Sequence, residues 1–142
     1  MLAHLEQVAR DLELPFGDRK MTYNSRLAQE LGKWAEQMGK GDAFHDSVFR
    51  AYFADGRNIA DANILADVAT SVGLDTREAH AVLAGRTFKE AVDTDWTRAY
   101  ESRVTAVPTF LTNGQTLAGA QPFNVLVNFM LQNNVIRRPS NH

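Results

Sequence analysis

Residues 104–114 read Val-Thr-Ala-Val-Pro-Thr-Phe-Leu-Thr-Asn-Gly, and this stretch decides the fold. Its β-branched and aromatic residues up to Thr112 are typical of a strand, and Asn113-Gly114 is the strongest short signal for a β-hairpin. The returning strand is expected over residues 115–118. Pro108 stands inside the run, where a proline removes a ladder hydrogen bond and is normally confined to an edge strand. The sequence therefore predicts one hairpin whose first strand contains an unusual proline.

Helical periodicity and helix-capping signals occupy the rest of the chain. The expected helices cover approximately residues 2–13, 26–38, 42–54, 61–72, 76–84, 87–103 and 122–132. The expected N-cap residues are Asn24 or Ser25, Asp42, Asp61 and Asp75. Because a lone two-stranded hairpin is marginally stable in water, the sequence implies a sheet that these residues do not complete by themselves.

The composition is that of an ordinary globular domain. The 142 residues are 44% hydrophobic and 23% charged, with a formal net charge of −2, which is typical of one domain with a core. This charge gives no general attraction to nucleic acid or to an anionic membrane, and no apolar run reaches the ~18 residues that span a bilayer. Glu6 and Arg10 interrupt the apolar pattern at the start, unlike a signal peptide. We expect a cytoplasmic protein with no nucleic-acid or membrane partner.

Several stretches resemble one known family. Residues 104–110, the Asn-Gly turn and residues 117–122, Leu-Ala-Gly-Ala-Gln-Pro, resemble the C-terminal strand, hairpin and helix of DsbA-family thioredoxin-fold oxidoreductases. The resemblance is greatest to the branch associated with polyketide synthesis. Residues 51–61 and Gly73-Leu74-Asp75 are similar to the family's inserted helical subdomain, and the start of that subdomain resembles Asn24-Ser25 with Ala28. Gln29 stands where the family often has histidine. The similarity covers nearly all of residues 1–132.

The resemblance implies the fold class and the domain organisation. The class is α/β, in a mostly helical, incomplete thioredoxin-like fold with a C-terminal β-hairpin plus helix and an inserted α-helical subdomain. Residues 1–142 are expected to form a single DsbA-like domain that lacks the family's N-terminal β-α-β segment. The helical insertion is expected at residues 24–86 and the C-terminal thioredoxin-fold half at residues 87–132.

The chemistry of the family depends on a Cys-x-x-Cys pair, because a thiolate attacks the substrate disulfide. These 142 residues contain no cysteine. We therefore expect a DsbA-like thiol–disulfide oxidoreductase family member that is not redox-competent as given. The sequence leaves open whether it is a fragment, a truncated gene product or a lineage that lost the motif.

The resemblance also implies a substrate-binding surface. In the family, a cis peptide bond precedes the counterpart of Pro108, and an extended peptide or protein thiol substrate pairs with the backbone of the preceding residue, here Val107. The expected substrate-binding residues are Thr105, Ala106, Val107, Pro108 and Thr109. Because an exposed sheet edge pairs with another strand, we also expect a homodimer.

Two alternative functions remain open. The first is a peptide- or protein-binding module that uses the surface around Pro108 without any redox step. The second is a relative of hydroxychromene-carboxylate isomerase and kappa-class glutathione transferase, whose essential residue or glutathione lies in the N-terminal part that is missing here.

Other polar residues favour structural roles. The histidines are His4, His45, His80 and His142. None has a second histidine or a cysteine at metal-binding spacing, so we expect neither a metal site nor a cofactor. Asp93 and Asp95 lie two positions apart in a predicted helix, where side chains do not share a face, and are expected to be solvated.

The aromatic residues are expected mainly in the core. Trp34 and Trp96 have the spacing of core anchors within their helices. The aromatic stripe from Phe44 to Phe53 is also predicted as core, with the border of a hydrophobic groove as the alternative.

Overall fold

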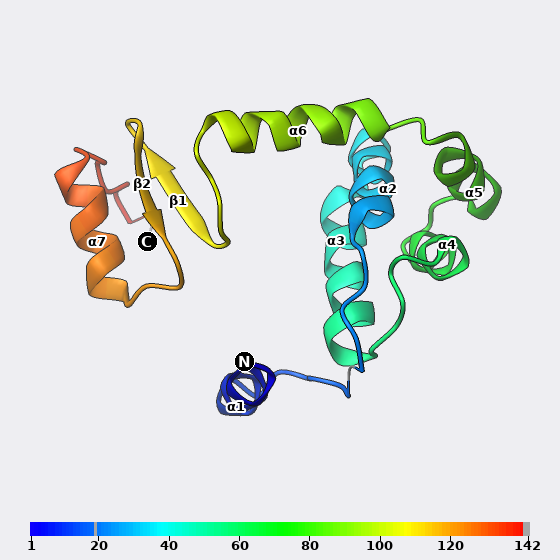
Figure 1. The fold of residues 1–142 in the computed structure, drawn as a ribbon, viewed down its shortest axis with the longest axis horizontal. Helices are drawn as coiled ribbons and strands as arrows, with labels where there is room; N and C mark the ends of the chain where they lie inside the picture. Colours follow the sequence, from blue (N-terminus) through cyan, green and yellow to red (C-terminus); the bar gives the residue numbers. More distant parts are fainter. Residues whose placement is uncertain (19, 141–142) are drawn as a thin grey trace. The chain divides into compact units, whose positions relative to one another are not determined.

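Figure 1 shows the computed structural model, which describes residues 1–18 and 20–140. The elements in chain order are α1 (Leu2–Asp11), α2 (Arg26–Gln37), α3 (Gly41–Phe49), the π-helical turn η1 (Arg50–Ala54), α4 (Ala62–Ser71), α5 (Thr76–Gly85), α6 (Lys89–Glu101), β1 (Thr109–Thr112), β2 (Gln115–Ala118) and α7 (Phe123–Gln132). The described chain is thus mostly helical with a small two-stranded sheet, as predicted. None of the described helices is long and apolar enough to cross a membrane.

The chain divides into two compact units, and the boundary falls within α6. We call Met1–Asp93 the helical unit and Thr94–His142 the C-terminal unit. The predicted division into an insertion at residues 24–86 and a C-terminal half at residues 87–132 stays a prediction.

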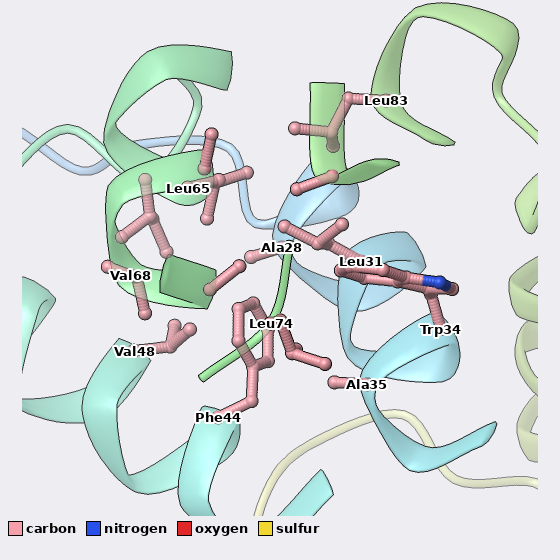
Figure 2. Close-up of a cluster of buried hydrophobic side chains, with 14 of the residues drawn as sticks. Ala28, Leu31, Trp34, Ala35, Phe44, Val48, Leu65, Val68, Leu74 and Leu83 are labelled. Atoms are coloured by element: carbon pink, nitrogen blue, oxygen red, sulfur yellow. The ribbon is translucent and has the colours of Figure 1, made fainter. Parts of the chain in front are cut away.

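The core of the helical unit is formed by apolar faces of four helices (Figure 2). The labelled side chains in that figure are Ala28, Leu31, Trp34, Ala35, Phe44, Val48, Leu65, Val68, Leu74 and Leu83. They come from α2, α3, α4, the connection after α4, and α5. Leu31, Phe44 and Leu65 are completely buried. Because burial of such a side chain contributes about 1.5–3 kcal/mol, this cluster is the main stabilising feature of the unit.

Two of the predicted helix caps are confirmed by hydrogen bonds. The Asp61 side chain accepts from the backbone N–H groups at the second and third positions of α4, at 2.7 and 3.4 Å. The Asp75 side chain accepts from the Glu78 N–H at 2.8 Å. The prediction for Asp42 was wrong, since α3 begins at Gly41 and Asp42 lies in the first helical turn, where its charge complements the helix dipole.

The π-helical turn η1 packs against the segment that follows α1. The Gly17 N–H donates to the Phe53 carbonyl at 2.8 Å. A Cβ atom at Gly17 would lie 2.1 Å from the Ala54 carbonyl oxygen, a distance that real side chains do not show. Glycine at this position therefore permits the close approach of the two backbones.

The C-terminal unit contains the predicted hairpin. β1 and β2 pair antiparallel with Thr112 opposite Gln115, and Asn113 and Gly114 both have positive φ, at 48° and 73°, as a two-residue hairpin turn requires. The Asn113 side-chain amide donates to the Asn133 carbonyl, which links the turn to the end of α7. Figure 1 shows α7 beside the hairpin. In the described part of the chain, α7 has no buried residue although it is rich in apolar side chains.

The first strand is shorter than predicted. Residues 104–108 form a connection, and the strand begins at Thr109. Pro108 has no N–H group to contribute to the ladder, so pairing at that residue is limited to its carbonyl, which accepts from the Gly119 N–H at 2.8 Å.

Candidate functional site

Four of the five predicted substrate-binding residues lie in the connection between α6 and β1, and the fifth, Thr109, is the first residue of β1. The direction of this connection is set at the end of α6, where Arg103 adopts a left-handed conformation with φ 58°. The Arg103 and Val104 N–H groups donate to the Tyr100 and Ala99 carbonyls, both at 2.9 Å. This pair of bonds is a Schellman motif, which ends the helix and turns the chain sharply.

The connection is exposed, and one side-chain hydrogen bond holds part of its backbone in place. The Val107–Pro108 peptide bond is cis. Val107 is 91% exposed, Thr105, Ala106 and Pro108 are also exposed, and Thr109 is half-buried. The Thr109 hydroxyl donates to the Ala106 carbonyl at 2.6 Å, which closes the turn around the cis peptide bond. We call residues Thr105–Thr109 the loop.

The hairpin ladder decides which backbone groups stay available. In an antiparallel pair, alternate residues exchange both of their hydrogen bonds with the partner strand. Because the Pro108 carbonyl bonds to Gly119 and Thr109 lies opposite Ala118, the backbone groups of Thr109 and Leu111 are directed away from β2. Among the described residues, the N–H and carbonyl of Val107 have no hydrogen-bond partner. The open edge of β1 thus begins at the exposed loop.

A surface hollow of about 430 Å³ adjoins this loop. One side is formed by α6 and the other by the connection itself. Its lining residues are Asp95, Trp96, Ala99, Tyr100, Val104, Thr105, Ala106 and Val107. The loop and the hollow together form the candidate site, and all of these residues belong to the C-terminal unit.

The prediction that both tryptophans are core anchors is correct for Trp34 and wrong for Trp96. Trp34 is buried in the core of the helical unit, as predicted, whereas Trp96 is 56% exposed and lines the hollow. Tyr100, which follows Trp96 by one helical turn, is 83% exposed. Helical spacing shows that the two rings share a face, but it does not show whether another element covers that face.

The predicted aromatic stripe is also divided by the structure. Phe44 is in the core, but Phe49 and Phe53 are exposed and line a second hollow of about 360 Å³ between α1 and the α3–η1 helix. The alternative prediction, a hydrophobic groove, is therefore correct for the later part of the stripe. The Asp46–Arg50 ion pair, at 2.9 Å, also belongs to its lining.

A buried carboxylate was not expected from the sequence. Glu30 of α2 is 1% exposed. Its Oε1 accepts from Arg26 Nε at 2.9 Å and from Arg86 Nη2 at 2.6 Å, and its Oε2 accepts from Arg86 Nε at 2.7 Å. Arg86 holds a left-handed backbone conformation, φ 50°, just after α5. Glu30 therefore ties α2 to the junction between α5 and α6.

The pKa of Glu30 is lowered, first by the hydrogen bonds from Arg86 and then by those from Arg26, against the opposing effect of burial. Asp93 belongs to the same cluster, with Arg26 Nη2 at 2.5 Å and Lys89 Nζ at 2.8 Å. The pKa of Asp93 is lowered by the bond from Lys89 first and from Arg26 second. Asp93 is thus an ion-pair partner within the helical unit, whereas Asp95 lines the hollow.

The histidines do not form a metal site in the described chain. Within residues 1–18 and 20–140, no group of three or more His, Cys, Asp or Glu side chains is arranged to hold a metal ion. His45 Nε2 lies 3.2 Å from a Glu36 carboxylate oxygen. His142 lies outside the described residues.

Comparison with known proteins identifies relatives of this chain. Its sequence matches the DSBA-like thioredoxin domain family over residues 1–130. It is 36% identical over 95 residues to the uncharacterized protein YwbO of Bacillus subtilis, an alignment that covers 66% of this chain and 48% of that protein. The chain thus spans about half the length of this curated relative.

Two solved structures have a similar fold. The crystal structure of a probable DsbA oxidoreductase from Streptomyces coelicolor superposes with a TM-score of 0.77 at 29% identity, over 94% of this chain and 59% of that chain. The structure of a 2-hydroxychromene-2-carboxylate isomerase superposes with a TM-score of 0.76 over 92% of this chain and 64% of the isomerase. At 22% identity the second likeness shows the fold alone.

The family match covers nearly the whole sequence, and it agrees with the open-edged hairpin, the helical unit and the solved relatives. The chain belongs to the DSBA-like thioredoxin domain family.

Proposed function

We propose that this chain supplies the substrate-holding part of a DsbA-like thiol–disulfide oxidoreductase, and that it binds an extended peptide or protein segment along the loop Thr105–Thr109. The observation that carries the proposal is that Val107 is exposed, and that its N–H and carbonyl have no hydrogen-bond partner among the described residues, next to the open edge of β1. A peptide strand that pairs there gains main-chain hydrogen bonds for affinity, while pockets beside the strand select side chains.

The proposal separates binding from redox chemistry. Thiol–disulfide exchange needs a thiolate that attacks one sulfur of a disulfide while the other leaves. With no cysteine in the 142 residues, this chain contributes no nucleophile. It is expected to bind a thiol-containing peptide or protein without oxidising or reducing it. Redox activity would belong to a polypeptide that also carries the cysteine pair.

The rival enzymatic function has less support. The isomerase is a fold relative of this chain, but its likeness carries no evidence on substrate. Glutathione binding measured by calorimetry would revive the isomerase and transferase alternative. Membership of the polyketide-associated branch stays a prediction, as does the cytoplasmic location, which fractionation of cells with an antibody against this chain would test.

The binding proposal is tested with backbone-modified peptides. The probe is a fluorescein-labelled heptapeptide, Gly-Thr-Val-Lys-Thr-Val-Gly, and binding to the whole chain is followed by fluorescence anisotropy. Single N-methyl groups are then placed on successive backbone nitrogens of the peptide. Because strand pairing uses the N–H groups of alternate residues, methylation at alternate positions should weaken binding by roughly tenfold, the cost of about one hydrogen bond.

The intervening N-methyl peptides are the matched controls, since they have the same composition and lose an N–H that points away from β1. Equal weakening at every position, or no weakening at any, would contradict backbone pairing. Absence of binding by the unmodified peptide and by longer variants of it would remove the proposed function itself.

We also propose that the protein forms a homodimer. α7 has several exposed apolar side chains, among them Phe123 and Leu131, and β1 has an open edge. Both kinds of surface associate readily with another chain in water. Light scattering at micromolar concentration should give twice the 15.8 kDa mass of the chain. A monomeric mass over the same concentration range would count against the dimer.

A further inference from the structure

The hairpin turn contains Asn113, the only asparagine of the sequence that is followed by glycine. The backbone nitrogen of the following residue can attack the side-chain carbonyl carbon of an asparagine, and glycine hinders this attack least because it has no side chain. Both Asn113 and Gly114 are exposed, so water reaches the turn. The turn therefore has the residue pair and the access to water that asparagine deamidation requires.

The attacking nitrogen of Gly114 is not engaged in a hydrogen bond. Its N–H donates to no other group among the residues that the structure describes. Apart from its neighbours in the chain, no atom lies within 4 Å of the position that a Cβ atom would take at Gly114. No neighbouring element therefore blocks a ring that forms on this side of the turn.

The Asn113 side chain also connects the turn to α7. Its amide group donates to the backbone carbonyl of Asn133, the C-cap residue of that helix. None of the residues of α7 is buried, so packing holds the helix only weakly and this hydrogen bond fixes its end to the turn. A change in the chemistry of Asn113 therefore acts directly on α7.

We propose that Asn113 deamidates in the folded chain and that the product releases the end of α7 from the hairpin. The Gly114 nitrogen bonds to Asn113 Cγ, the bond from Cγ to Nδ2 breaks, and the proton of the Gly114 nitrogen leaves with the amide as ammonia. Water then opens the resulting succinimide ring at either of its carbonyls, which gives aspartate or isoaspartate.

The product places a carboxylate where the amide donor was. A carboxylate cannot donate to the Asn133 carbonyl and is repelled by its oxygen. It also lies at the C-terminal end of α7, where the helix dipole disfavours a negative charge. Isoaspartate in addition lengthens the backbone of the turn, which disturbs the register that places Thr112 opposite Gln115. Each of these effects weakens the connection between the turn and α7.

The first experiment follows the reaction in the whole chain. The chain is kept at mildly alkaline pH and digested with trypsin, which releases residues 104–137 as one peptide. Mass spectrometry locates the deamidated residue, and isoaspartyl methyltransferase detects isoaspartate. A sample digested before the incubation gives the conversion that the digestion itself causes. Asn113 should deamidate several-fold faster than Asn124 and Asn128, which lie in the same peptide and precede larger side chains. An Asn113 that converts no faster than these two overturns the proposal.

The second experiment measures the release of α7 with two variants. Asn113→Asp reproduces one product, and Asn113→Gly is the matched control that removes the donor without adding a charge. Asp-Gly and Gly-Gly also form two-residue hairpin turns, so both variants retain the hairpin. In the native chain the N–H groups of Asn133 and Asn134 donate to the Phe129 and Leu131 carbonyls. Their hydrogen–deuterium exchange should be several-fold faster in Asn113→Asp, with an intermediate value in Asn113→Gly.

The N–H of Leu31 is the internal reference, because Leu31 is fully buried in the core of the helical unit and its exchange should not change. Equal exchange at Asn133 in the native chain and in Asn113→Asp overturns the release of α7. If Leu31 also exchanges faster, Asn113→Asp is destabilised as a whole. The comparison is then made between incubated native chains with and without the new negative charge, separated by anion exchange. Unchanged exchange at Asn133 between these two forms overturns the release as well.

Discussion

Replacement of Glu30 by glutamine should destabilise the protein by about 2 kcal/mol. The carboxylate accepts three hydrogen bonds from Arg26 and Arg86 at 2.6–2.9 Å. Glutamine has nearly the same shape, but its NH2 group donates, so at least one of these bonds must be lost. A hydrogen bond to a charged group contributes about 1.5–3 kcal/mol. Because Arg26 and Arg86 are 19% and 42% exposed and keep access to water, we expect a value in the lower half of this range.

The assay is urea unfolding followed by far-ultraviolet circular dichroism at neutral pH. For a chain of this size, a loss of about 2 kcal/mol in the free energy of unfolding would also appear in thermal unfolding, as a fall in Tm of roughly 5–10 °C. Glu36→Gln is the matched control, because Glu36 lies on the same helix but is 51% exposed, and an exposed ion pair contributes at most about 1 kcal/mol. The reasoning is refuted if the two variants lose equal stability.

The pH dependence gives a second, independent check on Glu30. Its pKa is lowered in the folded chain by the bonds from Arg86 and Arg26. The stabilising contribution is therefore complete above the ordinary glutamate pKa of about 4.3 and is lost as the pH falls through the lowered folded pKa. The stability difference between the native chain and Glu30→Gln should be constant near neutral pH and should shrink below that range. A difference that grows on acidification would show that the carboxylate is destabilised where it lies.

Three further substitutions test the fold. Gly17→Ala should lower the free energy of unfolding by about 1–3 kcal/mol, because the new Cβ would lie 2.1 Å from the Ala54 carbonyl oxygen. In the control Gly85→Ala the nearest neighbour lies at 3.5 Å, so this change should be neutral or stabilising by about 0.4–1 kcal/mol. Equal effects of the two substitutions in urea unfolding would contradict the steric explanation. Asp61→Ala should lower the free energy of unfolding by about 1 kcal/mol, since it removes the N-cap of α4. Asp61→Asn should retain most of that stability, because asparagine also caps helices. Equal losses in the two variants would assign the effect to the charge of Asp61. Phe44→Ala should cost about 3–5 kcal/mol, because the ring is fully buried, and a loss below about 1 kcal/mol would place Phe44 outside the core.

Local signals in the sequence were sufficient for the elements and several of their ends. Asn113-Gly114 determines the hairpin, because few residue pairs tolerate positive φ at two successive positions. Asp61 and Asp75 determine the starts of α4 and α5, because a cap interacts with backbone groups only two or three residues away. Thr105–Thr109 were selected through the family resemblance of the Val-Pro-Thr-Phe run, and their role in binding stays a prediction. The sequence also predicted that the strand begins at Val104, whereas it begins at Thr109.

Only the tertiary structure decided which faces of these elements are covered. Trp34 and Trp96 have the same helical spacing, yet one is buried and the other lines the hollow. Phe44 and Phe53 differ in the same way. Periodicity states which residues share a face, but burial depends on whether a distant segment packs there. The buried position of Glu30 likewise depends on Arg86, which is 56 residues away in the chain, and a charge in a helix is expected at the surface until such a partner is brought to it.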